Sequence, residues 1–147
     1  MVKIWVMGLL IVIGSFAGVA VAEDAHVAIV KNVAGSVEVL RGESRVKVSP
    51  GMQLMRMDKV LSGQDSQAGI VFIDGTLITV GSSTEVEIRK YLFEPKQASY
   101  GFSLYVKKGS AIYSSGKLGK LAPEAVNLET PRATVGIRGT RFILTVN

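Results

Sequence analysis

The sequence lacks cysteine altogether and has a single histidine. Without thiols there are no disulfides, no thiolate metal sites, no lipid-carrying cysteine and no cysteine nucleophile. His26 lies near the start of the expected mature chain, where residues are usually mobile, so we do not expect a general base there. One histidine also disfavours zinc and copper sites. We therefore expect no metal, no cofactor and no catalytic residue.

Long amphipathic helices and exact repeats are also missing. Instead, short apolar and β-branched runs recur roughly every 8–12 residues with glycine turns between them. The 147 residues, 48% of them hydrophobic, are enough for one core but crowded for two. This pattern predicts a single all-β domain of short antiparallel strands in a roll, solenoid-like or sandwich arrangement.

The first 22 residues have the pattern of a signal peptide. Lys3 is the only charge before Glu23, an apolar run follows it, and Ala20–Ala22 is a small-x-small cleavage pattern. We predict cleavage after Ala22, which leaves 23–147 as the mature domain in the periplasm or outside the cell. The alternative is an uncleaved anchor, because residues 4–22 are just long enough to span a bilayer.

The strongest strand signal is a hairpin. Ala68–Ile73 and Thr76–Val80 flank Asp74-Gly75, and an Asp-Gly pair between β-rich runs is typical of a type I′ turn. Both runs are almost continuously apolar, which places them at the centre of the core. In the first half of the chain, Val37 and Val39 are expected to share one buried face.

Three segments of the second half are predicted to be irregular. Residues 91–99 contain a proline and mixed polarity, Lys107–Gly109 has the composition of a turn, and residues 114–123 are rich in glycine and lysine without a steady period. We expect a loop, a turn and a long loop, respectively. Strands are predicted on either side of them, at 100–106, 110–113, 125–129, 133–137 and 141–146.

Positive charge is concentrated in the last third. Residues 23–95 carry eight Lys/Arg against ten Asp/Glu, whereas residues 96–147 carry eight against two. In an exported protein this field suits an acidic protein partner or an anionic lipid or polymer better than nucleic acid. The simpler interpretation is a solvated basic surface. The candidate partner-binding residues are Lys107, Lys108, Lys117, Lys120, Arg132 and Arg141.

Two carboxyl groups alone are sufficient for some hydrolases, so the acidic residues are also candidate catalytic groups. Glu85 and Glu87 alternate on one strand face and are expected to face solvent beside Arg89. Asp58 and Asp65 flank a turn-rich stretch, but their spacing follows no calcium-loop pattern. We expect these two aspartates to cap turn amides.

The most distinctive stretch runs from Thr130 to Phe142. Thr130-Pro131 is expected to open a strand, because proline needs no amide partner there. Gly136 and Gly139 are expected to allow a bulge or close packing. Arg138 is expected to act as an internal clamp on carbonyls or a carboxylate, with ligand binding as the alternative.

The order of these features resembles the FecR domain, named for the periplasmic regulator of ferric citrate uptake. The resemblance covers nearly all of residues 25–147, and its most specific block is Thr130-Pro131 followed by Val135–Thr140 and Phe142. The other matching pieces are Val33–Val37, Pro50–Leu54, Asp58–Val60, Ser62–Ala68, Asp74–Thr76 and Lys108-Gly109. The resemblance implies a β-rich rolled or solenoid-like fold, a protein-interaction role and no catalysis.

Regulators of this family also have a cytoplasmic segment that holds a sigma factor, a membrane helix and a secretin-like domain. Only three residues precede the apolar run here, so we do not expect sigma-factor control through this polypeptide. The leading hypothesis is an exported, non-catalytic protein-interaction module of the envelope, for signalling or scaffolding. The alternative is a structural protein that associates with anionic envelope polymer or lipid, and a third interpretation is a small acid-dependent hydrolase.

Overall fold

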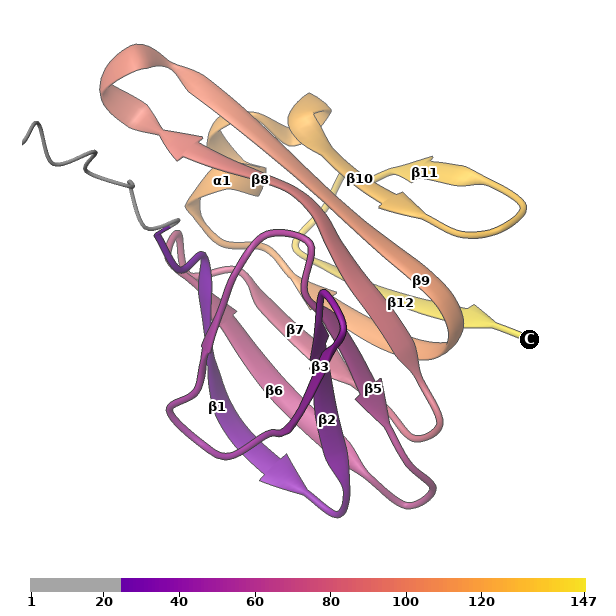
Figure 1. The fold of residues 1–147 in the computed structure, drawn as a ribbon. Helices are drawn as coiled ribbons and strands as arrows, with labels where there is room; N and C mark the ends of the chain where they lie inside the picture. Colours follow the sequence, from indigo (N-terminus) through magenta and orange to yellow (C-terminus); the bar gives the residue numbers. More distant parts are fainter. Residues whose placement is uncertain (1–24) are drawn as a thin grey trace, which may run out of the picture.

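The computed structural model describes residues 25–147, and the predicted leader, residues 1–22, lies outside them. The described chain is one all-β domain formed by a single curled, mainly antiparallel sheet (Figure 1). This confirms the predicted fold class. No helix within the described residues is both long and apolar enough to cross a membrane. The strands are β1 (Ala28–Ala34), β2 (Val37–Arg41), β3 (Ser44–Lys47), β4 (Gln53–Leu54), β5 (Lys59–Ser62), β6 (Gln67–Phe72), β7 (Leu77–Val80), β8 (Glu85–Glu94), β9 (Ser99–Ser114), β10 (Val126–Glu129), β11 (Thr134–Gly136) and β12 (Arg141–Val146); the helices are η1 (Pro95–Gln97), α1 (Lys117–Leu121) and η2 (Pro123–Ala125).

Strand β9 belongs to both arms of the curled sheet. The first arm has the order β3-β2-β5-β8-β9-β10-β11, and the second has the order β4-β1-β6-β7-β9-β12. β8 and β7 follow one another along one edge of β9, whereas β10 and β12 lie on its other edge. All neighbours are antiparallel except β10, which runs parallel to β9.

The corner between the two arms lies where we predicted a turn at Lys107–Gly109, and that prediction is wrong. β9 continues through this segment and bends at Gly109, which has φ +92°. A Cβ at Gly109 would lie 2.6 Å from the Cα of buried Thr84. The Thr84 hydroxyl accepts a hydrogen bond from the Ser110 amide at 3.0 Å. Contacts with a distant residue therefore bend the strand without reversing it.

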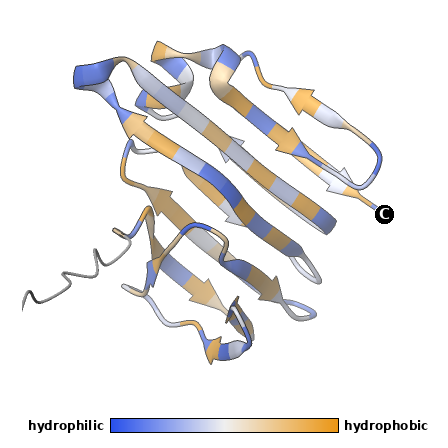
Figure 2. Ribbon diagram, turned by 45° about the horizontal axis from the view of Figure 1, so that its top comes forward, coloured by the Kyte–Doolittle hydropathy of each residue, from blue (hydrophilic) through white to orange (hydrophobic). Residues whose placement is uncertain are grey.

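The core lies between the arms, and both contribute to one cluster of buried side chains. Val37 and Val39 share a buried face as predicted, at 1% and 0% exposure. Along the strands apolar and polar residues alternate (Figure 2), and the buried apolar ones belong to this cluster. At its centre the Phe72 ring lies 5.1 Å from the ring of Tyr91 and 5.1 Å from that of Phe102.

The predicted loop at residues 91–99 is largely strand. β8 runs on to Glu94, and only η1 and Ala98 separate it from β9. Tyr91 is 1% exposed, and burial of its ring against Phe72 holds this part of the chain in register with β9. The long β8–β9 hairpin is the most prominent feature of the ribbon (Figure 1).

The hairpin at Asp74-Gly75 forms as predicted, but its turn is not type I′. Gly75 has φ +87°, whereas Asp74 is not among the residues with positive φ. The Gly75 amide donates to the Phe72 carbonyl at 2.9 Å, and the Phe72 amide donates to the Thr76 carbonyl at 2.8 Å. The turn is therefore one residue longer and has a bulge at Gly75.

This turn differs because the Asp74 side chain is buried, at 2% exposure, and bonded. Its carboxylate accepts hydrogen bonds from the Tyr91 hydroxyl at 2.7 Å, the Thr76 hydroxyl at 2.6 Å and the Leu118 amide at 3.0 Å. The last bond fixes α1 within the predicted loop 114–123, where Leu118 is 1% exposed. The loop prediction is thus wrong for residues 117–121.

Asp58 caps a turn, as predicted, by accepting from the Met55 amide at 2.9 Å. It also forms a two-bond ion pair with Arg41, whose Nε and Nη2 donate to the two carboxylate oxygens at 2.9 and 2.7 Å. This hydrogen-bonded carboxylate raises the pKa of the Arg41 guanidinium. The sequence did not indicate this pair, because Arg41 ends β2 and Asp58 lies in the turn before β5.

Candidate functional site at the open side of the sheet

The sheet is open on the side where β10, of the β10–β11 hairpin, and β12 pair with the same edge of β9 (Figure 1). Among the described strands, β11 pairs only with β10, and β12 pairs only with β9. Each of them therefore has an unpaired outer edge. We call this region, from Thr130 to Val146, the open side.

Strand β12 has two different faces. Phe142, Leu144 and Val146 are half-buried and pack against the core, whereas Arg141, Ile143 and Thr145 are exposed, with Ile143 at 64%. The alternation follows from the period of two along a strand. An exposed isoleucine at the centre of an edge strand, with no proline in the strand, is the arrangement that proteins usually avoid.

The backbone of β12 alternates in the same way. The Ser115 amide donates to the Thr140 carbonyl at 2.8 Å, in register with the pairs Arg141↔Ser114 and Phe142↔Tyr113. In an antiparallel ladder, hydrogen-bonded and non-bonded pairs alternate. The amide and carbonyl groups of Arg141, Ile143 and Thr145 therefore point away from β9, toward the unpaired edge.

Two hollows lie between β12 and the β10–β11 hairpin. The first, of about 450 Å³, has an apolar part formed by Pro123, Ile137 and Phe142 and a polar part formed by Glu124 and Arg138. The second, of about 410 Å³, lies between residues 130–133 with Val135 and residues 144–147. The inward side chains of β12 thus contribute to both hollows.

The motif residues Thr130 and Pro131 form the turn of the β10–β11 hairpin and do not open a strand, contrary to the prediction. The Thr130 hydroxyl accepts from the Ala133 amide at 3.0 Å, and the Thr130 amide donates to the Ala133 carbonyl at 2.8 Å. Gly139 has φ +137° in the link before β12, so glycine is required for its backbone. A Cβ at Gly136 would meet open space, so the predicted close packing is not found there.

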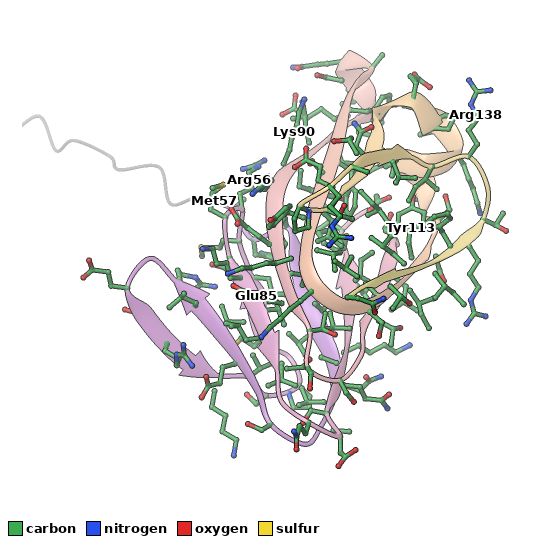
Figure 3. All side chains as sticks on the ribbon, turned by 90° about the vertical axis from the view of Figure 1, so that its right-hand side faces the viewer. Arg56, Met57, Glu85, Lys90, Tyr113 and Arg138 are labelled. Carbon is green, nitrogen blue, oxygen red and sulfur yellow. The ribbon has the colours of Figure 1, made fainter. Side chains whose placement is uncertain are left out.

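Arg138 is exposed, and within residues 25–147 it forms no hydrogen bond or ion pair. The predicted internal clamp is therefore wrong. Figure 3 shows Arg138 at the periphery of the molecule, whereas Tyr113 lies in the core. The reason is local: Arg138 follows buried Ile137 and precedes the bend at Gly139, so it points outward on the rim of the first hollow. The other motif residues, Thr140 and Phe142, lie in the link and on the inner face of β12.

The candidate basic residues do not form one patch. Arg141 pairs with Ser114 and Val146 with Gly109, so the two ends of β12 are about 17 Å apart along the strand. α1, which carries Lys117 and Lys120, begins three residues after Ser114 at the Arg141 end. Near the other end lie Lys107 and Lys108, which precede Gly109, and Arg132, which lines the second hollow with Val146.

One of these bases already has a partner. Lys107 lies 3.7 Å from Glu85, and Glu87 lies 3.9 Å from Arg89. Glu85 and Glu87 alternate with buried residues and lie on the outer strand face, with Glu87 beside Arg89 as predicted, but they are half-buried and not fully open to solvent. Arg89 also bonds Glu129 at 2.9 Å and stacks on the Tyr105 ring at 3.8 Å. These charges neutralise one another on the first arm.

No group of three or more His, Asp or Glu side chains within the described residues is arranged to hold a metal. The two buried aspartates, Asp58 and Asp74, are bonded inside the fold, and Asp65 is exposed in a turn. In the last third, Glu129 pairs with Arg89, which leaves Glu124 as the acidic residue that lines the first hollow.

Sequence reasoning missed Glu124, Val135, Ile143, Leu144 and Val146 as parts of this region. The alternation of Arg141–Val146 was a usable signal, because it marks a strand with one half-buried face. Nothing local indicates which residues of the hairpin lie opposite β12.

The comparisons with known proteins bear on the same part of the chain. A family model described as FecR protein matches residues 58–147. No curated protein and no solved structure gives a significant match. The matched region contains the corner, the Asp74 turn and the whole open side. On this match the chain belongs to the FecR protein family, a regulatory and signalling family of the cell envelope.

Proposed function

We propose that this chain is an exported, non-catalytic envelope signalling module that binds a protein partner through its open side. The observation that carries the proposal is the unpaired edge of β12, with Ile143 exposed at its centre and two hollows behind it. Extended protein segments bind such edges through main-chain hydrogen bonds. Membership of a regulatory family supports a binding role.

Site-specific photocrosslinking in intact cells tests this proposal. A photoreactive residue replaces Ile143, and the matched control replaces Val46, an exposed apolar residue on the edge strand β3 at the far end of the sheet. We expect a discrete protein adduct from position 143 and none from position 46. No adduct at position 143, or the same adducts at both positions, would overturn it.

Export has its own measurement. Intact-mass analysis of the protein from the envelope fraction is expected to give a chain that begins at Glu23, in agreement with the cleavage pattern at Ala20–Ala22. A chain that begins at Met1 contradicts cleavage and supports the anchor at residues 4–22.

A second candidate is association with an anionic envelope polymer or lipid. It is favoured by the six-charge excess of Lys and Arg over Asp and Glu in residues 96–147. Within the described residues, the ion pairs of this segment join Lys107 to Glu85 and Glu129 to Arg89, so its other bases have no ion-pair partner there. Such binding weakens when salt shortens the screening length from about 30 Å at 0.01 M to about 3 Å at 1 M. Envelope association that is unchanged across this range would contradict the second candidate.

A further inference from the structure

The open side has features that identify the chemistry of its occupant, and the inference that follows rests on the proposed function. We propose that β12 accepts one extended, acidic segment of another protein as an additional strand. The segment forms main-chain hydrogen bonds with Arg141, Ile143 and Thr145. It places apolar side chains toward the two hollows and acidic side chains against Arg132, Arg138 and Arg141.

The backbone is the first argument. Three alternate residues of β12, Arg141, Ile143 and Thr145, have amide and carbonyl groups that do not bond β9. The strand from Arg141 to Val146 pairs with β9 without interruption. An added strand would satisfy the same groups that a neighbouring strand satisfies elsewhere in the sheet. It would also cover Ile143, which is 64% exposed.

The hollows are the second argument. Behind the edge lie Phe142 with Ile137 in the first hollow, and Leu144 and Val146 with Val135 in the second. Phe142 marks the first hollow and position 145, midway between Leu144 and Val146, marks the second; the two positions are about 10 Å apart along the strand. Alternate side chains of an extended segment are about 7 Å apart, so two or three inward residues reach both hollows. These residues should be apolar.

Charge is the third argument, and it selects between occupants. Arg138 lines the first hollow with Glu124 as the only acidic residue there, and the second hollow, which Arg132 lines, has no acidic side chain among its described lining residues. Arg141 lies on the edge strand itself, and none of the three arginines has an ion-pair partner among residues 25–147. A second copy of this chain would bring the same arginines to the interface, which like-charge repulsion disfavours. An acidic segment is complementary.

The main-chain bonds are tested with Ile143→Pro against Ile143→Ala. Both remove the isoleucine side chain, but only proline removes the outward amide, which makes no bond to β9. With the photoreactive residue placed at Thr145, we expect the adduct to survive in Ile143→Ala and to be lost in Ile143→Pro. Equal adducts in the two variants would overturn strand addition, even where the adduct itself supports the proposed function.

Peptide selection tests the chemistry of the segment on the wild-type protein, so the result does not depend on whether a variant folds. A library of random decapeptides displayed on phage is selected on the purified protein. We expect enrichment of peptides with alternating apolar residues and net negative charge. The best peptide should bind at least about tenfold more weakly when its backbone is N-methylated at alternate residues or when its acids become lysines.

Three outcomes overturn the inference. The first is selection of neutral or basic peptides, or of none. The second is binding that is insensitive to N-methylation. The third is a concentration-dependent dimer in sedimentation that is lost in Ile143→Pro, because this result identifies a second copy as the occupant.

Discussion

Asp74 connects three parts of the fold through one carboxylate. It joins the β6–β7 turn to the Tyr91 hydroxyl on β8 and to the Leu118 amide in α1. A carboxylate only accepts hydrogen bonds, and here it accepts four from buried groups: the hydroxyls of Tyr91 and Thr76 and the amides of Thr76 and Leu118. Removing it leaves these donors unsatisfied.

We expect Asp74→Ala to lower the free energy of unfolding by about 3 kcal/mol, because buried donors lose a charged partner. For a domain of this size that corresponds to a melting temperature lower by roughly 10 °C. Asp65→Asn is the control, since Asp65 is exposed with φ +50° and asparagine tolerates this conformation. Equal thermal melts for the two variants would contradict the role of Asp74.

Arg138 gives a prediction opposite to the one that an internal clamp implies. Because its side chain is exposed and unpaired within the described residues, Arg138→Ala should change the free energy of unfolding by less than about 0.5 kcal/mol. It should reduce the adduct from position 143, because the partner loses a complementary charge. Thermal melts and crosslinking yield measure the two effects. A lowered melting temperature with an unchanged adduct would restore the clamp.

Among the elements, β9 determines the shape of the sheet. It pairs with β8 and β10 in its first half and with β7 and β12 in its second half. The change of partners coincides with the bend at Gly109. β9 has sixteen residues and four neighbouring strands. Through β8 and β7 it joins the two arms around the core, whereas β10 and β12 on its other edge leave the open side.

Gly109→Ala tests this corner. The substitution requires a non-glycine residue at φ +92° and puts its Cβ against Thr84, so we expect a loss of about 3 kcal/mol or more. Gly136→Ala is the matched control, because its Cβ would meet nothing within 4 Å. Urea unfolding should give a much lower midpoint for Gly109→Ala and an almost unchanged one for Gly136→Ala. Similar midpoints would show that the corner tolerates a side chain.

For the whole molecule, two buried tyrosines predict an alkaline limit to stability. Burial raises the pKa of both Tyr91 and Tyr113 above the ordinary value of 10.0, and the hydrogen bond to Asp74 raises that of Tyr91 further. The folded state therefore holds these protons more tightly than the unfolded state. Their stabilisation is complete below about pH 10 and is lost as the pH rises above that value.

We expect the free energy of unfolding to fall above pH 10 by up to about 1.4 kcal/mol per pH unit for each buried tyrosine. Tyr113→Phe removes one of the two titrating groups and should make this decline shallower. Urea unfolding at a series of pH values from about 8 to 11 measures it. A decline of the same slope in wild type and Tyr113→Phe would contradict the assignment.

The elements that the sequence predicted well are those whose pattern lies within one segment. The Asp74-Gly75 hairpin and the buried face of Val37 and Val39 follow from local alternation and turn chemistry. The errors lie where a distant residue overrides the local signal. Tyr91 continues β8 because Phe72 packs on it, and Leu118 forms a helical turn because Asp74 bonds its amide.

Local composition, then, was sufficient to establish the class of fold, most of the strands and, through the Thr130–Phe142 motif, the family. It did not reveal that β10 and β12 share an edge of β9, that Arg138 points outward, or that the basic residues separate to the two ends of β12. These depend on strand pairing and on the bend at Gly109, which join residues far apart in the chain. The period of a segment specifies its own faces, whereas its neighbours are selected by packing and hydrogen bonding across the whole sheet.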